Sequence, residues 1–424
     1  MMYRVLPLML PYDVVSDGQR LKLQNVVICF KRGDGLSQNS LCMEGWHRGM
    51  ALIAHICDIH VGARIGRVFP EDINRWWQMM LEDWRSLPER VELALVCGDV
   101  TSDGTDEQFE AAKAAIESLE VEAHLVPGSI DIAAGKENWI DRFGEIDKLV
   151  KNGGLNILLV DVLRDDEKRL WSLTEKQFGW LSKCFDERVG EPFMLVFQPL
   201  LERREGLFRP PWDEDAMEAL FERLRSVNLI CILCSGMHSN REGFVDGKLL
   251  IGTGALCGFR ITETPPERCI LTRPGYRLIA LDGIAIRTFW REITSRVQVT
   301  ITFVGGSHTL GPRPLVNMLD VYGDCTIYVQ AYARDAKITS VEIGLGGSPW
   351  LPMRKVWDGI WSEWEGTIRT YEIGWGQQLL VARARASNGE EAYDAIPFWM
   401  RSLPSQSATA VREAIVYELL QRPR

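Results

Sequence analysis

The sequence predicts an α/β domain followed by an all-β domain. Between residues 50 and 293, apolar runs of strand length alternate with amphipathic segments of helix length, as in repeated β–α units. Between residues 296 and 400, helical periodicity fades, and short alternating runs are separated by glycine-containing turns. A chain of 424 residues is also too long for one ordinary core, so two or three domains are expected.

The helices of the first region are marked by apolar stripes and by their N-terminal residues. Residues 71–87 place tryptophan, methionine and leucine side chains on one helical face. Thr105 and Thr174 each precede a glutamine by three residues, which is the capping-box pattern. Asp-Gly pairs at positions 246–247 and 282–283 predict two hairpins. A further helix is expected at residues 213–227, and strands at 51–57, 91–97, 122–127, 156–162, 192–197 and 228–234.

The second region has the size and the turn spacing of a β-sandwich. In the strand expected at residues 296–304, Val297, Val299, Ile301 and Phe303 alternate and should share one face. Further strands are expected at residues 326–333, 338–345 and 378–386.

Two terminal segments are expected to stand apart from these domains. Residues 1–49 show little periodicity and predict an N-terminal extension that adds little to the α/β core. Residues 405–424 contain a short amphipathic pattern, which predicts a C-terminal helix that docks on the rest of the protein.

The composition favours a cytoplasmic protein. With a net charge of -10, the chain gains little from binding a polyanion, so nucleic acid is not an expected partner. The ten cysteines are scattered over the chain, which fits free thiols better than a disulfide framework. Cys231 and Cys234 lie on one predicted strand and should point to opposite faces, so they cannot chelate one ion. No apolar run reaches the ~20 residues of a membrane-spanning helix.

Polar residues collect where the first predicted strands end. Asp58 and His60 follow the strand at residues 51–57, and side chains at i and i+2 of an extended segment face the same way. Asp99 follows the next strand. In open α/β sheets, sites form beyond the carboxyl ends of the strands. Taken alone, this pattern is weak evidence for a site, because hydrogen-bonded polar loops have the same residues.

The order of these motifs resembles that of the calcineurin-like metallophosphoesterases. Their motifs run D-x-H, G-D-x-x-x-x-G, G-N-H-D or G-N-H-E, a histidine beside a proline, and G-H-x-H. The resemblance extends over residues 51–289. It implies a β-sandwich flanked by helices, with two metal ions that activate a water and clamp a phosphate ester.

The resemblance is incomplete at the metal ligands. Asp58, His60 and Asp99 match, with Asp99 at the position of the aspartate that bridges both ions. His238 lies one residue away from a ligand position and could join if its loop shifts by one residue. The positions at which the chain departs from the family's ligand or catalytic residues are Ser129, Ile130, Gln198, Met237 and Ser239.

These departures predict at most one divalent ion, or none. Asp58, His60, Asp99 and His238 could hold it, and manganese suits this oxygen and imidazole set, with iron and zinc left open. Isoleucine at position 130 cannot donate a proton to a leaving group. We therefore expect an impaired enzyme that acts as a binding or assembly scaffold. A metal-dependent phosphoesterase with a one-metal site, and a module that binds a phosphate-bearing ligand without cleaving it, are the alternatives.

The second region resembles bacterial immunoglobulin-like or fibronectin-like modules. This resemblance implies packing, self-association or binding of a protein partner. Trp357, Trp361 and Trp364 either fill the core of this domain or form an interface, since large aromatic residues dominate both. The segments that carry the resemblance are residues 341–343, 350–353 and 379–386.

Overall fold

The computed structural model describes residues 51–400 apart from several internal gaps. The predicted extension at residues 1–49 and the predicted helix at 405–424 lie outside the described residues. The chain divides into two compact units, 1–296 with 310–312, and 297–309 with 313–424. The internal gaps are residues 134, 166–169, 199–212, 237, 246, 261–269, 284, 305–306, 309–318, 321–323, 346–348 and 370–375.

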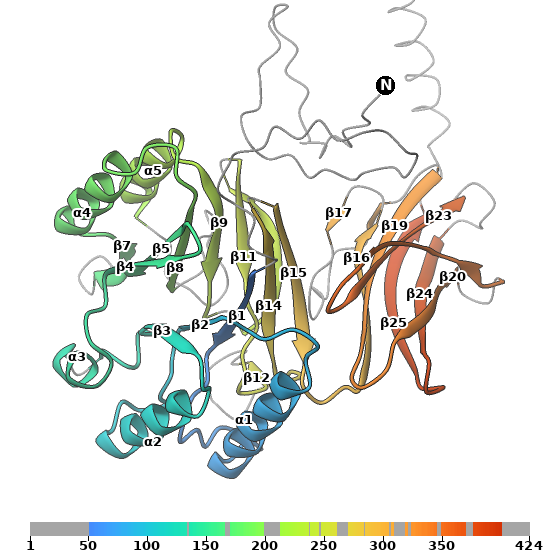
Figure 1. The fold of residues 1–424 in the computed structure, drawn as a ribbon, viewed down its shortest axis with the longest axis horizontal. Coiled ribbons are helices and arrows are strands. Elements are labelled where there is room, and N and C mark those ends of the chain that lie inside the picture. The colour runs from blue at the N-terminus through green and yellow to red at the C-terminus, as the bar shows by residue number, and fades with distance from the viewer. Residues whose placement is uncertain are drawn as a thin grey trace, which may run out of the picture. The chain divides into compact units, whose positions relative to one another are not determined.

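The first sheet of the first unit has the strand order β15-β14-β1-β2-β3 (Figure 1). Its three strands β1 to β3 run parallel, and the hairpin of β14 and β15 pairs antiparallel with β1. The carboxyl ends of β1 and β2 therefore lie side by side. The strands are β1 (Ala51–Cys57), β2 (Leu93–Cys97), β3 (Glu122–Val126), β14 (Gly275–Asp282) and β15 (Ala285–Glu292).

The second sheet has the order β10-β11-β9-β8-β5-β4. Its four central strands run parallel, and both edge strands are antiparallel to their neighbours. The strands are β4 (Lys148–Asn152), β5 (Leu155–Asp161), β8 (Phe193–Gln198), β9 (Leu229–Cys234), β10 (Arg241–Val245) and β11 (Lys248–Gly252). Two small hairpins pair β6 (Leu163–Asp165) with β7 (Leu170–Ser172), and β12 (Phe259–Arg260) with β13 (Ile270–Leu271).

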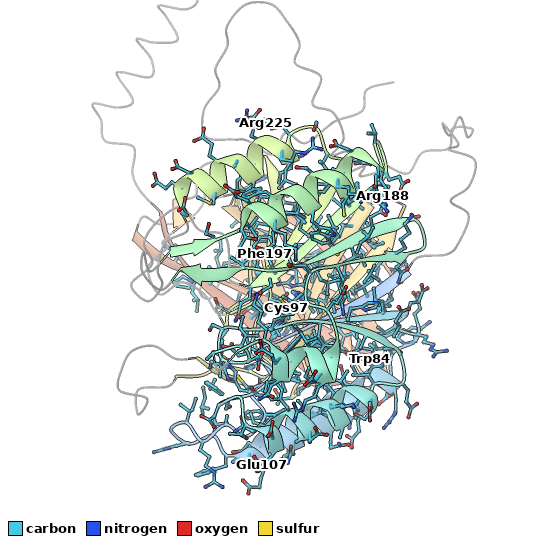
Figure 2. The ribbon with its side chains drawn as sticks, turned by 90° about the vertical axis from the view of Figure 1, so that its left-hand side faces the viewer. Trp84, Cys97, Glu107, Arg188, Phe197 and Arg225 are labelled. Carbon is cyan, nitrogen blue, oxygen red and sulfur yellow. The ribbon has the colours of Figure 1, made fainter. Side chains whose placement is uncertain are left out.

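The two sheets pack face to face and helices cover their outer faces (Figure 2). Aliphatic residues of both sheets, among them Ile53, Leu95 and Leu159, form the core between them. A second core lies between the six-stranded sheet and helices α4 (Glu175–Asp186) and α5 (Glu214–Leu224). The helices on the side of the other sheet are α1 (Pro70–Arg85), α2 (Asp106–Glu117) and α3 (Glu137–Phe143).

The predicted strands and helices of this unit are present, with ends that agree to within three residues. Cys231 lies in the core between the sheets and Cys234 in the core beneath α4 and α5, so they do point to opposite faces. The prediction missed α3 and β4, which are only seven and five residues long. None of the helices in the described part of the chain is both long and apolar enough to span a membrane.

The second unit is a β-sandwich with a single described apolar core. One sheet has the order β17-β16-β19-β23-β22 and the other β18-β25-β24-β20-β21. Residues of both sheets, including Ile327, Ile343 and Leu380, meet in the core. The strands are β16 (Val297–Val304), β17 (Ser307–His308), β18 (Leu319–Asp320), β19 (Asp324–Ala333), β20 (Ile338–Leu345), β21 (Leu351–Pro352), β22 (Arg354–Asp358), β23 (Ser362–Arg369), β24 (Gly376–Ala386) and β25 (Glu391–Met400).

Two details of this sandwich refine the sequence analysis. The pairing of β16 with β19 shifts between Ile301 and Phe303, so the simple alternation expected over residues 297–303 is interrupted. Trp364 belongs to the apolar core, and Trp361 is also buried, whereas Trp357 is half-buried. The core role therefore holds for Trp364. The immunoglobulin-like resemblance of the sandwich stays a prediction.

A buried ion pair connects helix α1 to the first sheet. Arg291 Nη2 lies 2.6 Å from Asp83 Oδ1, and neither side chain is exposed. The hydroxyl of Tyr276 donates a hydrogen bond to Asp83 Oδ2, at 3.0 Å. A buried charge that loses its partner is strongly unfavourable, so this pair makes α1 and β15 depend on each other.

We expect Asp83→Asn to destabilise the protein. The change leaves the buried guanidinium of Arg291 without its anion, which typically costs about 3–5 kcal/mol. Urea unfolding of the full chain should show a lower midpoint. The control is Glu82→Gln, which removes the same charge from an exposed neighbour in α1. An unfolding midpoint equal to that of the control would contradict this account.

Candidate metal centre

Five potential ligands from four strand ends converge beside the carboxyl ends of β1 and β2. The donor atoms of Asp58, His60 and Asp99 lie within 4.8 Å of one another, and so do those of His60, His238 and Cys257. All five side chains are buried, from 0% exposure at Asp58 to 9% at Asp99. The structure thus brings together the four ligand candidates from the sequence and adds Cys257.

Parallel pairing of β1 and β2 continues into the loops that carry the first three candidates. The amide of Asp58 donates to the carbonyl of Cys97, and the amide of His60 donates to that of Asp99, at 3.2 and 3.0 Å. Figure 2 labels Cys97, the last residue of β2, between the two helical layers. The two loops therefore run side by side and present their side chains to one place.

Left-handed backbone, rather than extended strand, directs these side chains. The φ angles of Asp58, His60 and His238 are 49°, 55° and 48°. Such angles are uncommon for residues other than glycine and concentrate at functional sites. Of the five non-glycine residues with positive φ in the described chain, three are in this cluster. The expectation that Asp58 and His60 converge through strand alternation was wrong, because β1 ends at Cys57 and both residues have left-handed rather than extended backbone.

The two histidines face each other through their Nε2 atoms, which are 3.2 Å apart. His238 Nδ1 donates to the carbonyl of Phe259, so in the neutral ring Nε2 carries a lone pair. His60 Nε2 also lies 3.9 Å from Asp99 Oδ2. Burial and the nearby His238 hold the pKa of His60 well below its usual value. The His60 ring is therefore neutral, the form that binds metals.

Backbone amides and one side-chain amide surround the carboxylates. Asp58 Oδ2 accepts from the amide of Gly236 at 2.8 Å. Asp99 Oδ1 accepts from the amide of Ile130 at 3.1 Å. Gly128 is required here, because a Cβ at this position would lie 2.0 Å from Asp99 Oδ1. The loops are thus built closely around the carboxylates.

The donor set fits a divalent ion. Two nitrogens bound to one ion at about 2.1 Å each can be 3.2 Å apart, as those of His60 and His238 are. Two carboxylates supply the charge that balances a dication. Within the described chain, His60 Nδ1 has no hydrogen-bond partner, so the orientation of this ring depends on what Nε2 contacts.

Gln198 links the groups around the position at which the family places a second ion. Its Oε1 accepts from the amide of Ser129 at 3.0 Å, and its Nε2 donates to Asp58 Oδ1 at 3.4 Å. A Cβ on Gly236 would lie 2.8 Å from Gln198 Nε2, so the amide is closely enclosed. An uncharged amide thus bridges two loops at the position where the sequence comparison expects a histidine.

The other departing residues add little to a second site. Ile130 offers Asp99 only its backbone amide, and the side chain of Ser129 is exposed. Ser239 is buried, and its hydroxyl has no hydrogen-bond partner among the described residues. Met237 lies outside the described residues.

Asp131, a match to the last position of the third motif, stabilises the loops instead of lining the ion site. Its carboxylate accepts hydrogen bonds from the amides of Val100, Thr101 and Gly128 and from the Thr101 hydroxyl, at 2.6–2.9 Å. Four donors from two loops hold the segment after β2 against the segment after β3. The role of this aspartate was not predicted from the sequence.

Cys257 and Phe259 were also missed by the sequence analysis. Phe259 lies against both histidine rings, with centroids 5.2 Å from His60 and 5.3 Å from His238. Burial raises the pKa of the Cys257 thiol well above its usual value. The available signal was their position: both closely follow β11, whose neighbour β9 leads to His238, so they belong to the same edge of the sheet.

No protein-family model matches the chain. Over 153 residues it is 24% identical to the probable glycerophosphodiester phosphodiesterase GpdQ of Arcobacter nitrofigilis. This match covers 34% of the chain and 55% of the relative. The chain therefore spans about half the length of the curated relative that it matches.

Two solved structures show a looser likeness. The chain is similar to the GAP50 anchor of the inner membrane complex of Plasmodium, with 12% identity, a TM-score of 0.41, and coverage of 57% of this chain and 85% of that one. It is also similar to purple acid phosphatase PPD1 from seeds of yellow lupin (Lupinus luteus), with 11% identity, a TM-score of 0.42, and coverage of 58% and 52%. Both TM-scores are below 0.5, so the fold of the first unit is assigned from its strand order and from the sequence match.

The first unit has alternating β–α order, two sheets packed face to face and helices on their outer faces. Its motifs follow the family's order at the strand ends, and the sequence match is to a phosphodiesterase. The first unit has a calcineurin-like metallophosphoesterase fold.

Proposed function

We propose that the first unit binds one divalent ion and serves as a binding or assembly scaffold rather than as an efficient phosphoesterase. Asp58, His60, Asp99 and His238 would hold the ion. The observation that carries the proposal is the amide of Gln198, which joins Asp58 to the amide of Ser129 where the family places ligands of a second ion. The first ion position keeps its donor residues, whereas the neutral side chain of Gln198 lies at the second ion position.

The chemistry of the remaining residues supports weak catalysis at best. A bound divalent ion would polarise a phosphate oxygen or lower the pKa of a water. Asp99 and the histidines can position such an ion, but Ile130 has no proton to give to a leaving group. Loss of a general acid usually lowers the rate by about 10²- to 10⁴-fold. Loss of the second ion removes one side of the clamp as well.

The second candidate function is a slow phosphoesterase with a one-metal site. It is favoured by the convergence of Asp58, His60 and Asp99 and by the left-handed backbone that maintains it. The match to a probable glycerophosphodiester phosphodiesterase makes a phosphodiester the substrate class to test first.

We also propose a cellular compartment and a partner-binding unit for the protein. The seven described cysteines are all free and buried, which supports a reducing compartment such as the cytoplasm. A protein partner, or a second copy of this chain, would bind through the second unit. Because Trp364 lies in the core of that unit, such a surface must use other residues.

The full chain should retain at most one divalent ion, and Asp99→Asn should lower that occupancy. The bridging carboxylate contributes charge that an amide cannot replace. Elemental analysis after growth with added manganese, iron or zinc measures the ion count. Glu107→Gln is the control, since it removes an exposed carboxylate of α2.

Turnover of bis(p-nitrophenyl) phosphate by the same preparations separates the two functions. The scaffold predicts a rate near background that Asp99→Asn does not change. Robust turnover that Asp99→Asn abolishes would instead establish the slow or full enzyme. Two retained ions would overturn the one-ion proposal, and no ion at all would remove the metal from it.

Gln198→Glu should destabilise the protein in the absence of metal by about 1–3 kcal/mol. The change replaces the donor to Asp58 with a like charge, while the shape of the side chain stays the same. Added Mn²⁺ should raise the melting temperature of this variant more than that of the natural protein. The exposed Gln78→Glu in α1 is the matched control. Equal melting temperatures with and without Mn²⁺ in all three proteins would count against the assigned role of Gln198.

A further inference from the structure

We propose that the thiol of Cys257 is a ligand of the ion, so that the site selects zinc-like ions over manganese. This inference rests on the proposed function, because it concerns the ion of that same site. The family motifs place only histidines, aspartates and an asparagine around their ions. A sulfur ligand would make the centre of this chain a different kind of metal site.

The backbone fixes Cys257 next to the first motif. Ala255 forms a parallel bridge with Cys57, and the amide of Leu256 donates to the carbonyl of Cys57 at 2.8 Å. The amide of Cys257 then donates to the carbonyl of Asp58 at 3.3 Å. Cys257 therefore continues the sheet beyond β11 and ends beside Asp58, at the same edge as the histidines.

The sulfur is within reach of both imidazoles. Cys257 forms a cluster with His60 and His238 in which one donor atom from each residue lies within 4.8 Å of the other two. The thiol packs beside the His238 ring, 3.7 Å from Nδ1, the nitrogen that donates to Phe259. Donors on a common zinc ion are at most about 4.4 Å apart, since Zn–S is about 2.3 Å and Zn–N about 2.1 Å.

A second observation points to a ligand at this cluster. His60 is 1% exposed, and its Nδ1 has no hydrogen-bond partner among the described residues. Its Nε2 faces the lone pair of His238 Nε2. An ion between the two rings would take one lone pair from each Nε2, and two nitrogens on one ion can be 3.2 Å apart.

The donor types decide which ion fits. With Cys257 the site offers five donors. The two imidazoles, the thiolate and one of the two carboxylates would make four ligands, the number that zinc prefers in proteins, and the other carboxylate would stay outside the coordination shell. Thiolate is a soft ligand that favours Zn²⁺ or Co²⁺, whereas manganese and magnesium favour carboxylate and water oxygens.

The alternative role for Cys257 is packing alone, since its thiol lies 3.9 Å from the carbonyl oxygen of Phe259. A packing cysteine would leave no trace in the spectrum of a bound ion.

The test uses the full chain, stripped with a chelator and titrated with Co²⁺. We expect one ion per chain and a thiolate-to-cobalt charge-transfer band in the near ultraviolet. Cys257→Ser should lose this band and bind Zn²⁺ roughly 10- to 100-fold more weakly, while its affinity for Mn²⁺ changes little. The control is Cys231→Ser, in which a buried cysteine of β9 outside the cluster is replaced, and it should keep the band.

The outcomes distinguish this inference from the proposed function. One Co²⁺ bound without the band would overturn the role of Cys257 and leave the one-ion site intact. No Co²⁺, Zn²⁺ or Mn²⁺ bound to the natural chain would overturn both. Because the chain has ten cysteines, the band is assigned to Cys257 by its loss on substitution, and Cys257→Ala is the second variant if the serine variant fails to fold.

Discussion

The carboxylate of Asp58 is fully buried where the ends of several strands meet, and much of the surrounding architecture compensates for that burial. An unpaired buried carboxylate costs several kcal/mol, so groups that donate hydrogen bonds must surround it. The amide of Gly236 and the side chain of Gln198 do so from two other strand ends. Each comes from the second sheet, so the charge on Asp58 couples the loops of one sheet to those of the other.

The same requirement explains the unusual backbone of the site. Amides can point at a buried carboxylate only if the chain turns tightly around it, and the left-handed angles of Asp58, His60 and His238 provide such turns. Gly98 has a φ of 91°, and a Cβ there would lie 2.6 Å from Asp58 Oδ1. This local strain persists because the pairing of β1 with β2 and the four hydrogen bonds to Asp131 hold the loops on both sides.

Hydrophobic periodicity and turn residues were sufficient to predict every strand of the two sheets except β4. They also placed Asp58, His60 and Asp99 together, because parallel strands end at one edge. Contacts between distant segments were beyond this reasoning. That Gln198 would bridge Asp58 and Ser129, and that Cys257 would reach His238, follows from loop paths that no local pattern encodes. The short helix α3 was missed because one and a half turns leave hardly any periodicity to detect.

The loop after β9 shows how a site can keep one half while it loses the other. His238 is held by the carbonyl of Phe259, and Asn240 accepts from the amide of Gly254 and from buried Arg277, at 2.9 and 3.0 Å. Arg277 in turn pairs with Glu242 in the second sheet. These contacts fix the loop in a register that turns His238, and not its neighbour Ser239, toward His60. On the other side of Asp58, the amide of Gln198 donates to the carboxylate, so a neutral side chain lies there while the two histidines stay together.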